Sequence, residues 1–245
     1  MEVKNKLLNF DAIIYQNNEW FKFSLDSVLL ANFVTINYRT KNILDIATGN
    51  APIPMLLTFR TSAKIYGIEV QTEVYNLGVK SILENNMQNQ IKIINDDIKN
   101  YQNYFKNNYF DVIVSNPPYF EVNNQKVINT NDVKSIARHE ILITLEEIVK
   151  ISSTLLKKGG IFSLVHRPER LIEIIELMKK YNIEPKKIQF VYTNLEKDAK
   201  IILIEGIKYG NKGLKINKPL YIYESDGNYT KEVKKMFGEC NNVAK

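Results

Sequence analysis

The sequence predicts an α/β fold: a seven-stranded, mostly parallel sheet with one antiparallel strand and helices on both faces. The first indication is that short apolar runs alternate with helix-length segments from about residue 42 onward. This alternation is typical of parallel strands joined by crossover helices. The second is that only the short polar link 194–199 joins the last two apolar runs, which favours a hairpin and so one antiparallel strand. The third is size, because 245 residues, 44% of them hydrophobic, suffice for one large α/β domain.

The predicted elements follow one another in a regular order. We expect strands over 42–47, 64–70, 91–96, 109–115, 161–166, 187–193 and 200–207. We expect helices over 52–60, 71–86, 145–157 and 168–181. Pro52 and Pro54 stand at the start of the first of these helices, where proline is tolerated because the first turn needs no backbone N–H.

The two ends and one internal stretch are less regular. A further helix-length segment, 23–35, precedes the first strand, so we expect 1–40 to be an N-terminal helical extension. Residues 209–245 are basic and show no clear period, which predicts an irregular C-terminal extension. The polar, Asn-rich stretch 120–137 is expected to be a loop. Since no repeat or linker interrupts the pattern, the expected organisation is a single domain over residues 1–245.

Composition narrows the classes of protein to consider. The net charge is +6 and the isoelectric point about 9.1, which suits a polyanionic partner such as nucleic acid, although a Lys-rich surface alone gives the same excess. The single cysteine, Cys240, excludes a disulfide framework and fits a reducing compartment. Neither a signal-like N-terminus nor an 18-residue apolar run is present, so we expect a cytoplasmic protein that binds no membrane. With two histidines and no Cys/His cluster, we expect no metal site.

The loop after the first predicted strand has the features of a ligand-binding turn. Gly49 allows a tight turn and a close approach of a ligand to the backbone. Ala47 stands where a dinucleotide-binding loop has its first glycine, and no phosphate-binding Lys-Ser/Thr pair follows, so a dinucleotide is not favoured. A small ligand with a carboxylate and an ammonium group suits the acidic Asp45 and the N–H groups of the loop.

Two further acidic groups stand at the ends of the next two strands. Glu69 lies 24 residues after Asp45, a spacing at which a carboxylate commonly binds ribose hydroxyls. Asp97 can accept from an adenine amino group while Ile98 packs on the ring. For each acid alone a structural role is the favoured interpretation, as the cap of a loop for Asp45, the cap of the next helix for Glu69 and part of a plain turn for Asp97. Together they occupy successive strand ends, which share one edge in a parallel sheet, and this predicts a ligand site there.

The tetrapeptide Asn116-Pro117-Pro118-Tyr119 follows the fourth predicted strand. Each proline lacks an N–H and has a fixed φ, so the chain leaves the sheet stiffly. The Asn amide oxygen and a proline carbonyl then become neighbouring acceptors that suit a planar amino group, and Tyr119 can stack on the group that bears it. A rigid strand-end turn without chemistry is the alternative interpretation.

Taken together, these motifs resemble those of class I S-adenosylmethionine-dependent methyltransferases, and the Asn-Pro-Pro-Tyr motif resembles their amino-methylating branch, which acts on adenine N6, cytosine N4 or glutamine amides. The resemblance implies a Rossmann-like class I fold and S-adenosylmethionine as cofactor, with S-adenosylhomocysteine as product. It implies that the cofactor is bound by residues of the N-terminal helix and the strand ends, namely Asp26, Asp45, Ala47, Thr48, Gly49, Asn50, Glu69, Val70, Asp97, Ile98 and Asn116. Ala47 departs from the more glycine-rich loop of many relatives.

Other segments resemble the bacterial tRNA adenine-N6 methyltransferases that modify tRNA-Val beside the anticodon. These segments are 23–31, 137–140, 158–162, 165–170, 213–214 and 219–223. The resemblance implies that the adenine is extruded from its stack into the site. The Asn116 amide oxygen and the Pro117 carbonyl then accept the two amino hydrogens, the nitrogen lone pair turns toward the methyl donor, and Tyr119 stacks on the base. Pro118 completes the catalytic motif.

A tRNA partner requires cations at the same edge of the sheet, because phosphate contacts dominate nucleic-acid affinity. The candidates for tRNA contact are Arg138, His139, Arg167 and Arg170. Lys197 and Lys200 are also basic, but a solvated loop charge is the favoured interpretation for both. His139 is assigned no role as a base. We expect a monomer or a weak dimer.

Three alternatives remain at this point. A protein glutamine-N5 methyltransferase acting on a release factor shares the Asn-Pro-Pro-Tyr motif, but usually carries an N-terminal helical domain, whereas only about 40 residues precede the first predicted strand. A DNA adenine methyltransferase usually carries a target-recognition domain, for which no long insert is seen. A non-catalytic RNA-binding module of the same fold is disfavoured by the intact acids and motif.

Overall fold

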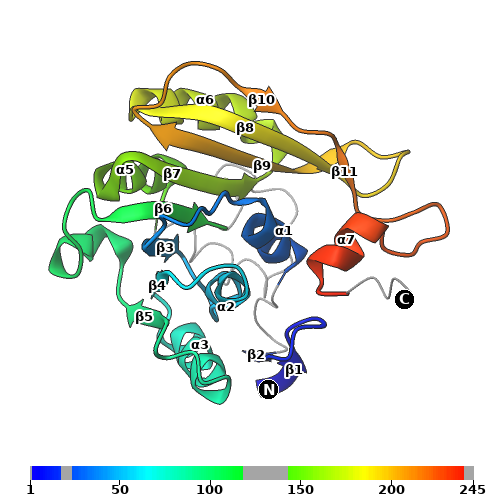
Figure 1. The fold of residues 1–245 in the computed structure, drawn as a ribbon, viewed down its shortest axis with the longest axis horizontal. Helices are drawn as coiled ribbons and strands as arrows, with labels where there is room; N and C mark the ends of the chain where they lie inside the picture. Colours follow the sequence, from blue (N-terminus) through cyan, green and yellow to red (C-terminus); the bar gives the residue numbers. More distant parts are fainter. Residues whose placement is uncertain (1, 18–23, 118–142, 240–245) are drawn as a thin grey trace, which may run out of the picture.

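A computed structural model describes residues 2–17, 24–117 and 143–239 of the chain. Its centre is a nine-stranded sheet, in which β10, β8, β9, β7, β6, β3, β4 and β5 follow one another across the sheet and β11 also pairs with β8 (Figure 1). Its long strands are β3 (Asn42–Ile46), β4 (Lys64–Glu69), β5 (Ile91–Asn95), β6 (Phe110–Ser115), β7 (Leu156–His166), β8 (Ile183–Tyr192) and β9 (Ala199–Lys208).

The seven long strands confirm the predicted sheet. β3 pairs in parallel with β4 and β6, and β5 and β7 extend the parallel pairing on either side. β9 runs antiparallel to both of its neighbours, β7 and β8, as the short polar link before it indicates. β7 begins at Leu156, five residues before the predicted start, because a bulge lets the strand pair with Phe110 ahead of the regular register.

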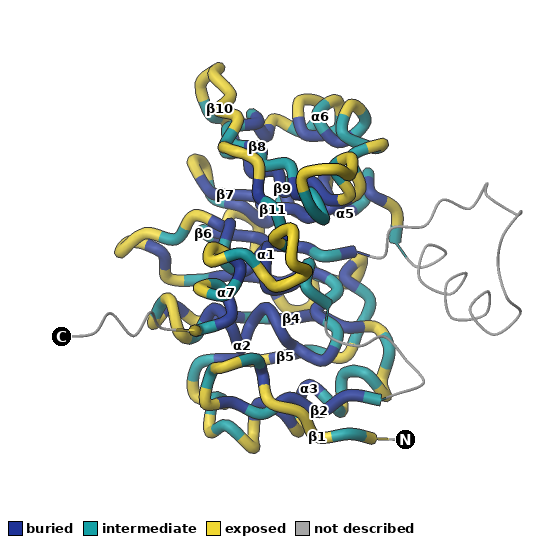
Figure 2. Tube along the Cα trace, turned by 90° about the vertical axis from the view of Figure 1, so that its right-hand side faces the viewer, coloured by how far each residue is buried: buried dark blue, intermediate teal, exposed yellow. Residues whose placement is uncertain are grey.

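Helices cover both faces, and each covered face has its own apolar core (Figure 2). One core lies under α1 (Leu25–Phe33), α2 (Pro52–Thr58) and α3 (Thr72–Glu84), and the other under α5 (Leu145–Leu155) and α6 (Leu171–Lys180). Two short 3₁₀ turns, η1 (Ile98–Asn103) and η2 (Pro168–Arg170), complete the connections. Consecutive residues of a strand point to opposite faces, so Ile43 joins the first core and Leu44 the second.

The helix expected over 23–35 is present as α1, but the described residues before it are not helical. Before α1 the chain forms an antiparallel hairpin of β1 (Glu2–Lys6) and β2 (Ile13–Asn17), which lies beside α3 (Figure 1). Asn85 accepts from the Ile13 N–H at 2.8 Å and donates to the Ile13 carbonyl at 2.6 Å. The Ser81 hydroxyl accepts from the Tyr15 N–H at 2.9 Å. Side chains at the end of α3 therefore satisfy backbone hydrogen-bonding groups on the outer edge of β2.

The C-terminal extension is irregular over most of its described length, as expected, but it also contains two short strands and one short helix. β10 (Lys215–Ile216) and β11 (Leu220–Tyr221) each add two residues in parallel to the edge of β8, which raises the predicted seven strands to nine. α7 (Lys231–Met236) then packs beside α1, where the Asn32 amide donates to the Met236 carbonyl at 3.5 Å. Val233 is fully buried in the same core as α1. No helix in the described part of the chain has the length and apolarity that a bilayer span requires.

Candidate active site

The carboxyl ends of β3, β4 and β6 meet at one edge of the sheet. Ile46, the last residue of β3, is paired with Ile68 of β4 on one side and with Ser115 of β6 on the other. Glu69, the last residue of β4, and Asn116, just after β6, directly follow these two partners, so both lie beside the loop after β3. Ser115 strengthens this edge, because its buried hydroxyl donates to the Ile46 carbonyl at 3.0 Å. The structure thus brings the first, second and fourth predicted motifs together.

The loop between β3 and α2 has a left-handed backbone at every second residue. The φ angles are 59° at Ala47, 60° at Gly49 and 66° at Ala51. A left-handed conformation costs a non-glycine residue about 1–2 kcal/mol, so the two alanines hold a shape that glycine adopts freely. A Cβ added to Gly49 meets nothing within 4 Å. Open space therefore lies beside Gly49.

Asp45 is buried beneath this loop with half of its carboxyl group unpaired. Its side chain is 1% exposed, and Oδ2 accepts from the Thr48 hydroxyl at 2.7 Å. Its buried Oδ1 has no hydrogen-bond partner among the described residues. Burial raises the pKa of Asp45 to about 8, with a further push from the Glu69 carboxylate, while the Thr48 hydroxyl acts in the opposite direction. A buried acceptor without a partner is costly, and a cationic donor from a ligand would satisfy it.

Glu69 joins the first loop to the second. Its side chain is 5% exposed, and Oε2 accepts from the Gly49 N–H at 2.9 Å. Oε1 accepts from the Gln71 backbone at 3.0 Å and from the Gln71 amide at 3.3 Å. Each carboxylate oxygen has more than one lone pair, so acceptor capacity is left for a ligand hydroxyl. Val70, beside it, is exposed at 36%.

Asp97 and Ile98 follow β5 at the next strand end. Asp97 Oδ1 accepts from the Lys99 N–H at 2.9 Å and so caps η1, and its Oδ2 lies 3.2 Å from the Lys99 ammonium. Ile98 is buried at 5% exposure in the core on the α5 side. The structure therefore gives Asp97 a capping role, while leaving it partly accessible at the shared edge.

Asn116 is half-buried, and its side chain reaches across to α1. Its Nδ2 donates to the buried Ser27 hydroxyl at 3.1 Å. Pro117 is buried directly after it. Asp26, half-buried, stands next to Ser27 in the first turn of α1, so the helix brings it to the same edge. Pro118 and Tyr119 lie outside the described residues, so the stacking and second-proline predictions have no counterpart here.

The hairpin also contacts the candidate site. Asn50, 7% exposed, donates its amide to the Tyr15 carbonyl at 2.8 Å. Thr48, 3% exposed, donates its backbone N–H to the Ile68 carbonyl at 3.0 Å. The loop after β3 is therefore fixed from both sides, by β2 and by β4.

Of the four predicted tRNA contacts, two are described. Arg167 is exposed directly after β7, and its guanidinium donates to the Lys200 carbonyl at 3.1 Å. Arg170 is half-buried, and Nε and Nη2 donate to the Glu173 carboxylate at 2.7 and 2.6 Å. Lys197 is exposed in the link between β8 and β9. Arg138, His139 and the predicted loop 120–137 lie outside the described residues.

His166 is a buried neighbour of these cations at the end of β7. Its Nδ1 accepts from the Arg167 N–H at 2.8 Å. Burial lowers the pKa of His166 to about 4, with a further lowering by the Arg170 guanidinium. The imidazole is therefore neutral at physiological pH.

Sequence reasoning missed Ser27, Ser115 and the Tyr15 carbonyl as parts of this edge. Ser27 reads as one polar residue near a helix start, and its partner lies 89 positions away. Ser115 reads as the end of an apolar strand. The signal for both exists only in the tertiary structure.

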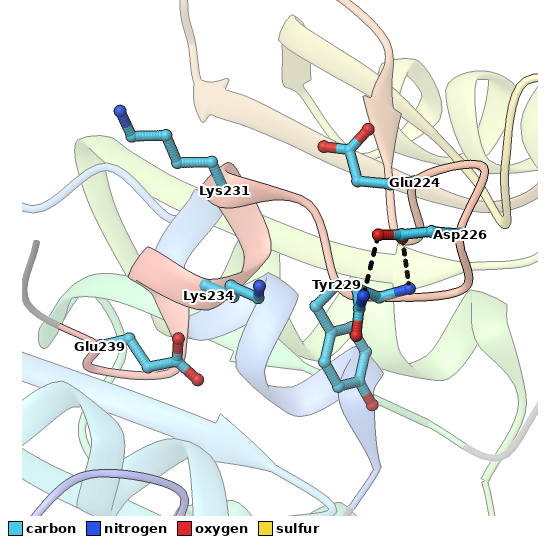
Figure 3. A pocket seen from close by; sticks show the side chains of 7 residues that line it. Glu224, Asp226, Tyr229, Lys231, Lys234 and Glu239 are labelled. Atoms are coloured by element: carbon cyan, nitrogen blue, oxygen red, sulfur yellow. Dashed lines mark hydrogen bonds between the residues drawn. The ribbon is translucent and has the colours of Figure 1, made fainter.

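A separate cavity lies near the C-terminal end and is unconnected with these strand ends (Figure 3). Its volume is about 340 Å³. It is lined by residues around α7, namely Glu224, Asp226, Asn228, Tyr229, Lys231, Lys234 and Glu239. Its lining carries charges of both signs, three acidic and two basic. Within the described ranges, no three His, Cys, Asp or Glu side chains gather as a metal site would require.

Comparison with known proteins agrees with this geometry. The chain is 28% identical, over 85% of its length and 86% of the relative's, to the tRNA1(Val) (adenine(37)-N6)-methyltransferase of Pedobacter heparinus. Among solved structures it superposes on a predicted O-methyltransferase of Agrobacterium tumefaciens with a TM-score of 0.70 and 20% identity, over 87% of this chain and 96% of the other.

A more distant structural neighbour is the geranyl diphosphate C-methyltransferase of Streptomyces coelicolor, solved with S-adenosyl-L-homocysteine. Its TM-score is 0.55 at 10% identity, over 74% of this chain and 76% of the other. At such identities the likeness establishes the fold alone. The family model described as "Methyltransferase small domain" matches residues 22–191, well over half of the chain. With its sheet order, its loop after β3 and its Asn-Pro motif after β6, this chain belongs to the methyltransferase small domain family.

Proposed function

We propose that this protein transfers a methyl group from S-adenosylmethionine to the N6 amine of an adenine beside the anticodon of a tRNA, of the tRNA-Val type. The observation that carries the proposal is that Asn116 and Pro117 leave β6 at the same edge as Asp45 and Glu69. An amine-binding motif and an acidic ligand site thus adjoin each other. We further propose that residues 1–245 act as one domain in the cytoplasm, as a monomer or a weak dimer.

The residues at the edge fit the cofactor. The unpaired Oδ1 of Asp45 suits its ammonium group, and the open space beside Gly49 suits a ligand that lies against the backbone. Glu69 suits its ribose hydroxyls, and Asp97 with Ile98 suits its adenine. The remaining members of the proposed cofactor pocket are Asp26, Ala47, Thr48, Asn50, Val70 and Asn116. When bound, the cofactor supplies an electrophilic methyl group on a cationic sulfur.

Asn116 and Pro117 prepare the amine that receives this methyl group. In adenine the N6 lone pair is conjugated with the ring, which makes the amine a poor nucleophile. The Asn116 amide oxygen and the Pro117 carbonyl accept the two amino hydrogens and draw the lone pair out of conjugation with the ring, so that it can attack the methyl group. They also stabilise the positive charge that develops on the nitrogen. One of the amino protons passes to solvent to give the neutral N6-methyl product, with S-adenosylhomocysteine as the leaving group. Tyr119 stacks on the extruded base. The rest of the rate enhancement comes from the positioning of the amine against the methyl group.

A tRNA substrate is supported by charge and by relatives. The chain has a net charge of +6, and the relative from Pedobacter heparinus is named as a tRNA adenine-N6 methyltransferase. We assign phosphate contacts to Arg138, His139, Arg167 and Arg170. Arg167 is the better placed of the described pair, because it is exposed at the end of β7, whereas Nε and Nη2 of Arg170 donate to the Glu173 carboxylate.

The test is to incubate the full-length protein with labelled S-adenosylmethionine and total tRNA from a strain that lacks it. Nucleoside mass spectrometry should then show label in N6-methyladenosine, and mass spectrometry of nuclease fragments should find it in the fragment that contains the anticodon. A parallel reaction contains a release factor in place of tRNA. Label in a glutamine of that factor, with none in tRNA, would replace the proposal by the glutamine alternative. Saturable cofactor binding without transfer to either would indicate a catalytically silent protein.

A further inference from the structure

The strongest unassigned contact at the edge joins the first turn of α1 to Asn116. Ser27 and Asn116 are 89 positions apart in the chain, and Asn116 Nδ2 donates to Ser27 Oγ at 3.1 Å. Ser27 is 4% exposed, so water does not compete freely for this hydrogen bond. α1 lies beside the end of β6 and packs its buried residues into the core on that face (Figure 1).

A carboxamide has two unlike ends, and only one suits the proposed reaction. Its oxygen accepts hydrogen bonds, whereas its nitrogen carries two donors and accepts none. A substrate amine that is to be methylated needs an acceptor for its hydrogens. With the amide turned by half a rotation, Asn116 would present N–H groups to an amine that also bears N–H groups. The end that faces the substrate therefore decides whether Asn116 helps or hinders.

The contact with Ser27 occupies the nitrogen end. Because Nδ2 points at α1, the Oδ1 atom on the other side of the same planar amide points away from Ser27. Because Ser27 is fixed in a helix, it holds the amide plane in one place rather than following the motions of Asn116. Pro117 adds to this by fixing the backbone on the other side.

We propose that Ser27 is a positioning residue of the methyl transfer, which holds the nitrogen end of the Asn116 amide so that its oxygen faces the substrate amine. The inference rests on the proposed function, because it matters only if Asn116 accepts from an amine. Ser27 touches neither substrate nor reacting atoms in this role. It acts through Asn116 alone.

The experiment compares Ser27→Ala, Ser27→Thr and Ser153→Ala with the wild type. Ser153 is the matched control, since it too is a helix serine with one hydrogen bond to another element, to the Tyr181 carbonyl at 2.6 Å. We expect Ser27→Ala to lower kcat for tRNA by about 10- to 100-fold, the range that follows from misplacing a catalytic group. Its Kd for the cofactor should stay within about twofold. Ser27→Thr should recover part of kcat, because it keeps the hydroxyl.

A double-mutant cycle with Asn116→Ala separates positioning from stability. In the Asn116→Ala background, adding Ser27→Ala should cause no further loss of kcat. Thermal denaturation is the control that checks whether each variant is folded at the assay temperature. Full activity of Ser27→Ala, or an equal loss in Ser153→Ala, would overturn the role of Ser27. So would a loss of cofactor affinity that matches the loss of kcat. A wild type that methylates no tRNA adenine would instead overturn the proposed function, and this inference with it.

Discussion

The backbone N–H of Gly49 donates a hydrogen bond to Glu69 Oε2 at 2.9 Å, which ties the loop after β3 to the end of β4. Gly49 has a φ of 60°, and a side chain added there would meet no protein atom within 4 Å. The backbone conformation therefore favours glycine, as it would at Ala47 and Ala51 of the same loop, and the space beside Gly49 is available to a ligand.

Replacing Gly49 by Ala separates these two roles when Gly159→Ala serves as control. Gly159 also has a positive φ, 80°, and open space beside it, but it stands near the start of β7, away from the carboxyl edge. We expect each variant to lose about 1 kcal/mol of stability in urea unfolding. Only Gly49→Ala should weaken S-adenosylmethionine binding, by roughly tenfold or more in calorimetry. Equal affinities in the two variants would show that no ligand lies against Gly49.

Asp45 should make the stability of the ligand-free protein fall as pH rises. Its folded pKa is raised to about 8 by burial, whereas an unfolded Asp titrates near 3.9. Between these values the folded state binds more protons than the unfolded state, so this group lowers stability with increasing pH, by up to about 1.4 kcal/mol per pH unit. Asp45→Asn removes that slope. The variant should be more stable than the wild type in urea unfolding at pH 9, with the difference shrinking toward pH 5.

The same carboxyl group should release a proton when a cationic ligand binds. At pH 7 Asp45 is mainly protonated in the ligand-free protein, and an ammonium beside Oδ1 favours the ionised form. Calorimetry of cofactor binding in two buffers of different ionisation enthalpy should detect this proton for the wild type. Asp45→Asn should bind at least about tenfold more weakly and release none. Identical proton release by both proteins would remove Asp45 from the ligand site.

Asn116→Ala should abolish methyl transfer while leaving cofactor binding nearly intact, because Asn116 is one of many members of the proposed cofactor pocket and the others stay in place. The amide oxygen acts on the substrate amine, so we expect kcat to fall by about 100-fold or more, with the cofactor Kd within about threefold of the wild type. Asn211→Ala, at an exposed position near the C-terminal strands, is the control. Parallel losses of transfer and cofactor affinity would contradict the assigned role.

Arg167→Ala should weaken tRNA binding and flatten its dependence on salt. Each phosphate contact contributes about 0.7–0.9 to the slope of log affinity against log salt concentration. Loss of Arg167 should reduce the slope by about this amount. Arg39→Ala is the control, because Arg39 is exposed just before β3, at the opposite end of that strand, and stacks on Tyr38. A slope unchanged from the wild type would take Arg167 out of the interface.

The seven long strands and their helices were predictable for two reasons. The spacing of apolar residues reflects local structure, and the geometry of crossover connections allows few strand orders. Asp45, Glu69 and Asn116 follow from the same rule, since residues after parallel strands share an edge. The β1–β2 hairpin was not predictable. Its first strand is almost wholly exposed, and the second is completed by side chains of α3 some 70 positions away. β10 and β11 are too short to show a period.

Within the site, the sequence indicates which groups gather but not how they are held. Glu69 illustrates this difference. Its spacing from Asp45 predicts a ligand contact, yet the hydrogen bonds to Gly49 and Gln71 arise only when two loops meet. Asn116 can likewise be recognised in the sequence by the prolines after it. Ser27, in contrast, is linked to the site only by a tertiary contact with Asn116.

The hydrogen bond from Asn50 to the Tyr15 carbonyl has a thermodynamic corollary for the N-terminus of the chain. Docking of the hairpin and occupancy of the loop after β3 are linked equilibria, and linkage is reciprocal. If the docked hairpin raises ligand affinity by a given factor, a saturating ligand raises the equilibrium constant for hairpin docking by the same factor. The hairpin then frays less. Amide exchange along β2 should therefore slow on saturation, so that the hairpin would report whether the neighbouring site is filled.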